Sequence, residues 1–88
     1  MVSYKIFWKK SAAKELKNIN KQIIPKIISA VQKLSDNPFP VGVKKLTASD
    51  YTYRIRVGDY RVVYSVFENQ LIIEIIRVGH RKDIYRKN

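Results

Sequence analysis

Three arginines surround the dipeptide Gly58-Asp59, namely Arg54, Arg56 and Arg61. Glycine supplies the positive φ that tight two-residue hairpin loops require, so the dipeptide predicts a hairpin turn. In that hairpin Arg56 faces Arg61, and the alternation of side chains along a strand puts Arg54 on the same face. Like charges directly opposite one another destabilise a sheet. We therefore expect this face to bind an anion.

The residues after this hairpin predict one more strand. A loop at 68–69 places Glu74 opposite Val63 and Ile76 opposite Arg61, with Glu74 on the arginine face. The other face is apolar or aromatic, and it is the face that needs to be buried. Its members are Tyr53, Ile55, Val57, Tyr60, Val62, Tyr64, Ile73 and Ile75.

The pattern of apolar residues predicts an α+β fold with the order β-α-α-β-β-β. Apolar residues recur every three or four positions from Ile23 to Leu34, which is typical of one buried helical face. We expect two helices to pack on the apolar face of a mostly antiparallel four-stranded sheet, in a single domain over residues 1–88. The expected elements are a strand at 2–8, a helix at about 11–18 with Ser11 as N-cap, and a second helix that ends before Asp36. Asn20 is a candidate cap for the second helix, and Pro25, about a turn inside it, indicates that the regular helix starts near Gln22 or is kinked there. A loop at 39–50, strands at about 51–57, 60–67 and 70–78, and a tail or single helical turn after Gly79 follow.

The composition narrows the classes of partner. The chain has 18 lysines and arginines against 7 acidic residues, a net charge of +11. Nucleic acid, an anionic membrane surface and an acidic protein all fit such a charge. There are no cysteines, and 88 residues are too few for a deep cofactor pocket, so we expect no metal and no cofactor. The N-terminus has lysines where a signal peptide is apolar, and no apolar run is long enough to span a membrane, so we expect a cytoplasmic protein without a membrane partner.

Two stretches carry a family resemblance. The run Tyr-Arg-Ile-Arg-Val-Gly-Asp-Tyr-Arg-Val-Val-Tyr at 53–64 and the ending Arg-Val-Gly-His-Arg-Lys-Asp-Ile-Tyr at 77–85, with the order of elements, resemble the RelE toxins of the RelE/ParE superfamily. The resemblance covers nearly the whole chain. It implies a ribosome-dependent endoribonuclease that cuts mRNA in the ribosomal A site by 2′-OH attack on the scissile phosphate, inhibits translation, and is held inactive by an acidic RelB-type antitoxin.

By position, the resemblance implies a catalytic set of Arg54, Arg56, Arg61, Arg81 and Tyr85. An arginine stays charged and its fork reaches two phosphate oxygens, so Arg61 and Arg81 suit a clamp on the phosphate, with Arg56 in support. The best-known relatives have lysines at the positions of Arg54 and Arg56. Arginine is a poor base because it keeps its proton. The proton acceptor must therefore be sought elsewhere.

Three residues are candidates for that acceptor. Tyr85 ranks first, because the positive charge of neighbouring basic residues favours a phenolate. His80 ranks second, since a histidine exchanges protons near neutral pH, and Glu74 is a distant third. Each also has a structural alternative: Tyr85 can pack on the sheet, His80 can simply be exposed, and Glu74 can be a counter-ion for Arg54.

Eight lysines are candidates for contacts with RNA or ribosome phosphates, and a solubilising surface is an equal alternative for each. They are Lys9, Lys10, Lys14, Lys17, Lys21, Lys26, Lys44 and Lys45. Phosphate contacts of this kind position a protein without reading sequence. Two other functions stay open: a ParE-like toxin that acts on DNA gyrase without cleaving RNA, and a degenerate module that only binds RNA or an antitoxin.

Overall fold

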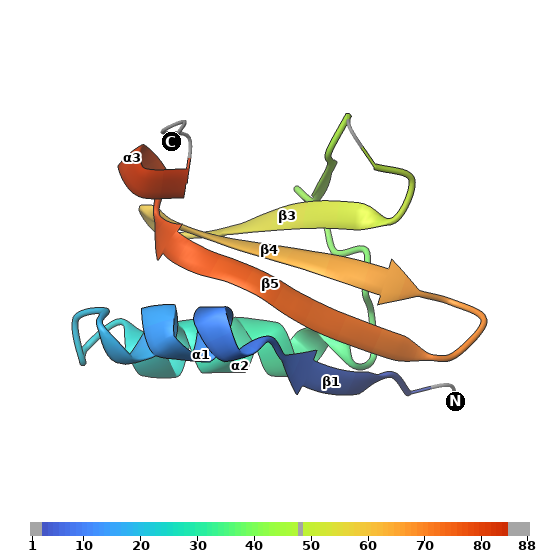
Figure 1. Ribbon diagram of the computed structural model, residues 1–88, viewed down its shortest axis with the longest axis horizontal. Coiled ribbons are helices and arrows are strands. Elements are labelled where there is room, and N and C mark those ends of the chain that lie inside the picture. The colour runs from blue at the N-terminus through green and yellow to red at the C-terminus, as the bar shows by residue number, and fades with distance from the viewer. Residues whose placement is uncertain (1–2, 48, 85–88) are drawn as a thin grey trace.

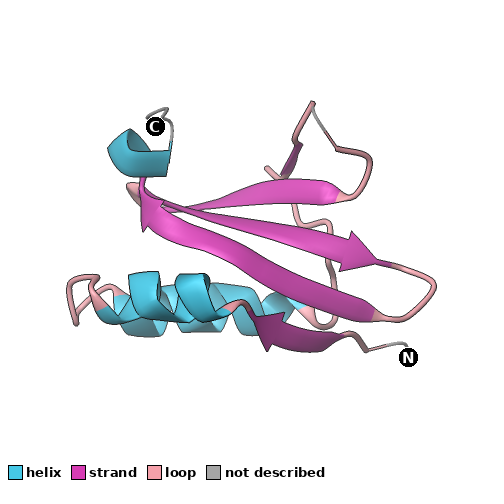
Figure 2. Ribbon diagram, in the orientation of Figure 1, coloured by secondary structure: helices cyan, strands magenta, loops and turns pink. Residues whose placement is uncertain are grey.

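The computed structural model describes residues 3–47 and 49–84. Figure 1 shows a sheet with α1 and α2 together against one side, and α3 at the end of β5, away from them. Figure 2 shows the same layers by type of element. Along the chain these elements are β1 (Lys5–Trp8), α1 (Lys10–Lys17), α2 (Ile24–Leu34), β2 (Lys44–Lys45), β3 (Thr52–Val57), β4 (Tyr60–Phe67), β5 (Ile72–His80) and α3 (Arg81–Ile84). The predicted α+β class and the order of its six main elements are confirmed.

The sheet has five strands, in the order β1-β5-β4-β3-β2, where the sequence predicted four. The additional strand, β2, lies in the predicted loop and pairs Lys44 with Arg54 and Lys45 with Tyr53. A strand of two residues is too short to show any alternation, so only its pairing defines it. β1 pairs with β5 in parallel and the other pairs are antiparallel, which agrees with the predicted mostly antiparallel sheet.

The core lies between the helices and the predicted apolar face. Tyr64, Val62, Ile73 and Ile75 are fully buried, and Ile55 is nearly so. Partly buried aromatic and aliphatic residues pack around them; of the predicted face these are Tyr53, Val57 and Tyr60. From the helices, the core takes Ala12, Ile27, Val31 and Leu34. The alternation read from the sequence is therefore confirmed for this face.

The helix boundaries differ from the prediction by a few residues. α1 has Lys9 at its N-cap position and no side-chain cap, so the expected cap at Ser11 is wrong. Asn20 does accept a hydrogen bond from the backbone N–H of Gln22, at 2.9 Å, but this turn precedes the helix. α2 begins at Ile24 with Pro25 in its first turn, where a missing N–H costs nothing.

The register of the second hairpin was predicted wrongly. Phe67 pairs with Ile72 across a four-residue loop, in which Leu71 has a φ of 56°. A bulge between Val63 and Tyr64 then shifts the pairing by one more residue. The bulge changes the spacing of the buried residues of β5 from two, between Ile73 and Ile75, to three, between Ile75 and Val78. Because Ile75 and Ile76 are both apolar, the sequence alone did not show where the alternation shifts.

Candidate functional site

The turn between β3 and β4 organises the predicted anion-binding face. Arg56 pairs with Arg61 across this hairpin, as the sequence predicted. Gly58 has a φ of 60°, which an L side chain rarely adopts. Its carbonyl oxygen accepts a hydrogen bond from Arg56 Nε at 3.1 Å and another from Arg61 Nη1 at 3.4 Å. Both guanidinium groups therefore lie against one backbone oxygen.

The Arg61 side chain is more enclosed than the sequence suggested. Arg61 is 8% exposed, and among the described residues it is the charged residue whose side chain is buried. Its Nη1 also donates to the carbonyl oxygen of Tyr60, at 3.2 Å. Arg56, by contrast, is exposed and Arg54 is half-buried. A ligand at this face therefore meets Arg56 first and reaches only part of Arg61.

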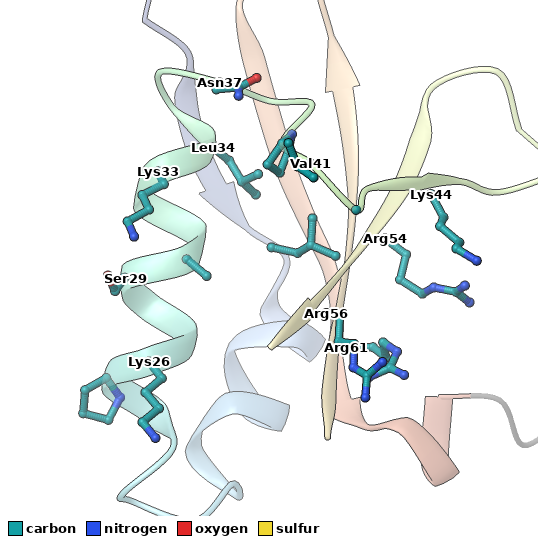
Figure 3. Close-up of a pocket in the computed structure, with 15 residues that line it drawn as sticks. Lys26, Ser29, Lys33, Leu34, Asn37, Val41, Lys44, Arg54, Arg56 and Arg61 are labelled. Atoms are coloured by element: carbon teal, nitrogen blue, oxygen red, sulfur yellow. The ribbon is translucent and has the colours of Figure 1, made fainter. Parts of the chain in front are cut away.

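Strand β2 adds a cation that the sequence did not place here. Lys44 lies directly opposite Arg54, so both side chains lie on the same face of the sheet. Figure 3 shows Lys44 and Arg54 side by side, and Arg56 and Arg61 next to one another further along the hairpin. Lys44 therefore lies in the arginine cluster, although the sequence assigned it to a more general RNA-binding surface.

A groove of about 1050 Å³ lies between α2, the 37–42 segment and β3. Its apolar lining includes Ala30, Leu34, Val41 and Ile55, and Figure 3 shows Leu34 and Val41 between the helix and the strands. Six cationic residues line it as well, and none of the described lining residues is acidic. The six are Lys26, Lys33, Lys44, Arg54, Arg56 and Arg61. The groove suits a ligand that is both anionic and partly apolar.

Arg81 is connected to the same turn through its backbone. Its N–H donates to the carbonyl oxygen of Asp59 at 2.8 Å, at the first residue of α3. The Arg81 side chain is exposed. The structure thus brings Arg81 next to the hairpin that carries Arg56 and Arg61, which the sequence alone did not determine.

His80 is less available as a base than its residue type suggests. Its Nδ1 accepts a hydrogen bond from the backbone N–H of Lys82, at 3.2 Å. In the neutral tautomer that fits this bond, Nε2 carries the proton and cannot accept another. The ring also packs edge-on against Tyr60, with centroids 5.4 Å apart. The hydrogen bond from Lys82 therefore occupies the acceptor nitrogen of the neutral ring.

The other two candidates for the proton acceptor lie elsewhere. Tyr85 lies outside the described residues. Glu74 pairs with Ser65, and the expected pairing with Val63 is wrong. Arg61 pairs with Gly79, not with Ile76. Because a strand rises about 3.3 Å per residue, Glu74 is roughly 13 Å from Arg61 along β4.

All eight lysines of the predicted RNA-binding set are exposed. Two of them, Lys26 and Lys44, line the groove, and Lys33, which the sequence analysis did not select, joins them. Lys33 lies seven residues, about two helical turns, after Lys26 in α2, so helical periodicity was the signal that pointed to it. The remaining six do not line this groove.

One ion pair links α1 to β5 and was missed in the sequence. Glu15 accepts a hydrogen bond from the backbone N–H of Val78, at 2.9 Å, and lies 3.3 Å from the Arg77 guanidinium. The paired part of β1 ends at Trp8, opposite Ile75, so Glu15 satisfies a backbone group on the uncovered edge of β5. No local pattern connects residues 62 positions apart.

One buried tyrosine fixes the wall of the groove. The Tyr64 hydroxyl donates to the carbonyl oxygen of Pro38, at 2.7 Å. Burial raises the pKa of Tyr64 well above its usual range, and the neighbouring Tyr53 adds to the shift. Tyr64 therefore stays protonated and holds the start of the segment that forms one side of the groove.

Within the described residues, no cluster of three or more histidine, cysteine or acidic side chains could hold a metal ion. Within the same ranges, none of the helices is long and apolar enough to cross a membrane.

Comparison with known proteins places this chain in one class. The chain matches the family model described as the ParE toxin of type II toxin-antitoxin system, parDE, over residues 6–85. It is 32% identical over 85 residues to toxin RelE3 of Methanocaldococcus jannaschii, which covers 92% of this chain and 94% of the relative. It is 30% identical over 79 residues to toxin RelE of Mycobacterium tuberculosis, which covers 89% of this chain and 81% of the relative.

Comparison with solved structures leads to the same class of protein. The archaeal RelE–RelB complex from Pyrococcus horikoshii matches with a TM-score of 0.80 and 29% identity, over 91% of this chain and 97% of that one. Fold and sequence together define a toxin of a type II toxin–antitoxin system. The chain belongs to the ParE toxin family, and within the superfamily it is a RelE-type toxin.

Proposed function

We propose that this toxin is a ribosome-dependent endoribonuclease that cleaves mRNA in the A site and so inhibits translation. The observation that carries the proposal is the clustering of cationic groups around one turn: Arg56 and Arg61 on the Gly58 carbonyl, and the start of α3 at Arg81 on the Asp59 carbonyl. Guanidinium groups that are held in place suit a phosphate whose negative charge grows during cleavage.

The reaction needs three contributions from the protein. The 2′-OH must lose a proton, the pentacoordinate phosphorus must be stabilised, and the 5′-oxygen must gain a proton. Arg56, Arg61 and Arg81 are assigned to the second contribution, with Arg54 binding a neighbouring phosphate. Tyr85 remains the proposed proton acceptor, because the hydrogen bond at His80 Nδ1 and the position of Glu74 make these two less suitable.

The same proposal assigns partners. Solved relatives from Pyrococcus horikoshii and Methanococcus jannaschii are described as RelE–RelB complexes. For this chain we infer a small acidic antitoxin, because the groove combines apolar residues with six cations and no acid. The ribosome and mRNA are the other partners, with the exposed lysines contacting phosphates, and the site of action is the cytoplasm.

The test is induction in cells, followed by primer extension on mRNA. We expect cuts within translated reading frames. Arg61→Ala and Arg81→Ala should each reduce cleavage on the order of 10²-fold, since each removes one group that stabilises developing charge. The matched control is Lys5→Ala, which removes an exposed cation from β1, at the opposite edge of the sheet. Intact mRNA at toxic levels of the protein would overturn the proposal.

A second function has a specific observation in its favour. The matching family model is that of the ParE toxin of parDE, and ParE-type toxins resemble this fold while acting on DNA gyrase. In that case induction damages DNA and leaves mRNA uncut. Because the arginine cluster has no role in such a mechanism, Arg61→Ala should then leave toxicity unchanged.

A further inference from the structure

The two carbonyl groups of the β3–β4 turn each hold part of the cationic site. The Gly58 oxygen accepts hydrogen bonds from the Arg56 and Arg61 side chains, at 3.1 and 3.4 Å. The Asp59 oxygen accepts one from the Arg81 backbone, at 2.8 Å. Two residues of backbone thus join cations from β3, β4 and α3 before any ligand is present.

We infer that Gly58 and Asp59 are the positioning residues of the anion site, and that they act through their backbone oxygens. The inference rests on the proposed function in one respect, because it takes the ligand of the site to be a phosphate group. Neither residue touches that phosphate. Their role is to hold Arg56, Arg61 and Arg81 in the arrangement that binds it.

Electrostatic repulsion between the arginines explains why a carbonyl oxygen is needed at this place. Arg56 and Arg61 are cross-strand partners, and two cations opposite one another repel. A carbonyl oxygen carries partial negative charge, so an oxygen between the two guanidinium groups offsets part of this repulsion. It also removes freedom from long side chains before binding, so that less freedom is lost when the anion arrives.

The backbone conformation at position 58 makes the position of these carbonyl groups sensitive to the residue there. Gly58 has a φ of 60°, and a Cβ added there meets no atom within 4 Å. An L side chain there therefore causes no clash, and its effect comes from the backbone conformation alone. An L residue disfavours this φ, whereas a D residue prefers it. The two forms of alanine give a matched pair of variants with the same composition and opposite backbone preference.

The experiment compares the wild-type chain with synthetic chains that have L-alanine or D-alanine at position 58. The probe is inorganic phosphate, titrated while the side-chain Nε–H signals of Arg56 and Arg61 are followed by NMR. We expect the D-alanine chain to bind phosphate as the wild type does. The L-alanine chain should bind about three-fold to ten-fold more weakly, with the Arg56 Nε–H exchanging faster with solvent. Equal affinity and equal exchange in both chains would overturn the inference.

A second pair of variants perturbs the turn without strain. One glycine is inserted between Gly58 and Asp59, and in the control one glycine is inserted between Asn69 and Gln70, in the loop at the other end of β4. Because short loops respond to length more strongly than long ones, thermal unfolding of both variants checks that they fold. The first insertion should weaken phosphate binding, and the second should not. Equal loss in both variants would show that general loosening, not the turn, sets the affinity.

These results are independent of mRNA cleavage. If the wild type cleaves mRNA and the L-alanine chain cleaves equally well, the positioning role is wrong and the proposed function stands. If no chain cleaves mRNA while phosphate binding still depends on position 58, the proposed function is wrong and the positioning role stands.

Discussion

Replacing Tyr64 with phenylalanine tests how the groove is held together. The Tyr64 ring is fully buried, and its hydroxyl donates to the carbonyl oxygen of Pro38 at 2.7 Å. Pro38 is also buried and begins the segment that contributes Pro40, Val41 and Gly42 to the groove. The substitution keeps the ring and removes the bond that joins this segment to β4.

The expected loss of stability follows from what the substitution leaves behind. Proline has no N–H, so the carbonyl is the only backbone polar group of Pro38. Removing its buried donor leaves that oxygen unsatisfied, which costs about 1–3 kcal/mol. The ring itself stays in place and no cavity larger than one oxygen forms. We therefore expect the free energy of unfolding to fall by about 1–3 kcal/mol at neutral pH.

The pH dependence of the free energy of unfolding gives a second, independent test. Burial raises the pKa of Tyr64 in the folded protein, while an unfolded tyrosine titrates near pH 10. The unfolded chain therefore loses this proton first, and the stabilising effect is complete below about pH 10 and is lost as the pH rises above it. Above that pH the wild type should lose about 1.4 kcal/mol per pH unit from this group, a loss that Tyr64→Phe does not have.

The assay is urea unfolding of both proteins from pH 7 to pH 11. The difference between them should shrink above about pH 10, because the wild type alone has this titration. Tyr53→Phe is the matched control, since Tyr53 lies beside Tyr64 in the sheet and is only partly buried. A constant difference across the pH range, or no difference at pH 7, would refute the reasoning about Tyr64.

Two further predictions concern the edge of β5 and the cations of the groove. Glu15→Ala should destabilise the protein by about 1–3 kcal/mol in urea unfolding, because the Val78 N–H loses its acceptor. Glu15→Gln keeps an acceptor and should cost less, and equal losses in the two variants would contradict this. Lys44→Ala should lower the slope of log affinity against log salt for single-stranded RNA by about 0.7, since one phosphate contact is lost. Lys5→Ala is the control, and an unchanged slope for Lys44→Ala would remove that residue from the site.

Much of the fold was predictable because apolar periodicity is a local signal. The face that contains Ile55, Val62 and Ile75 was predicted correctly, and so was the pairing of Arg56 with Arg61 across Gly58-Asp59. A two-residue turn fixes the register of its hairpin, so these arginines could be paired from the sequence alone.

What could not be predicted depends on pairing at a distance. Strand β2 is defined only by its pairing, with Lys44 opposite Arg54, and the four-residue loop before β5 moved Glu74 away from its expected partner. A two-residue strand shows no alternation, and a register shift of two residues keeps every side chain on its face, so the apolar pattern reveals neither feature. The residue types around the site were therefore predictable, whereas the arrangement that joins Lys44 to the cluster required the structure.

The central claim is that the cations around the β3–β4 turn cleave ribosome-bound mRNA, and one measurement tests it directly. Purified ribosomes with a labelled mRNA in the A site are mixed with the toxin, and the new 3′ end is analysed. We expect cleavage within the A-site codon that leaves a 2′,3′-cyclic phosphate, is much reduced by Arg61→Ala, and is absent when the mRNA is free of ribosomes. Uncut mRNA, or equal cleavage by wild type and Arg61→Ala, would contradict it.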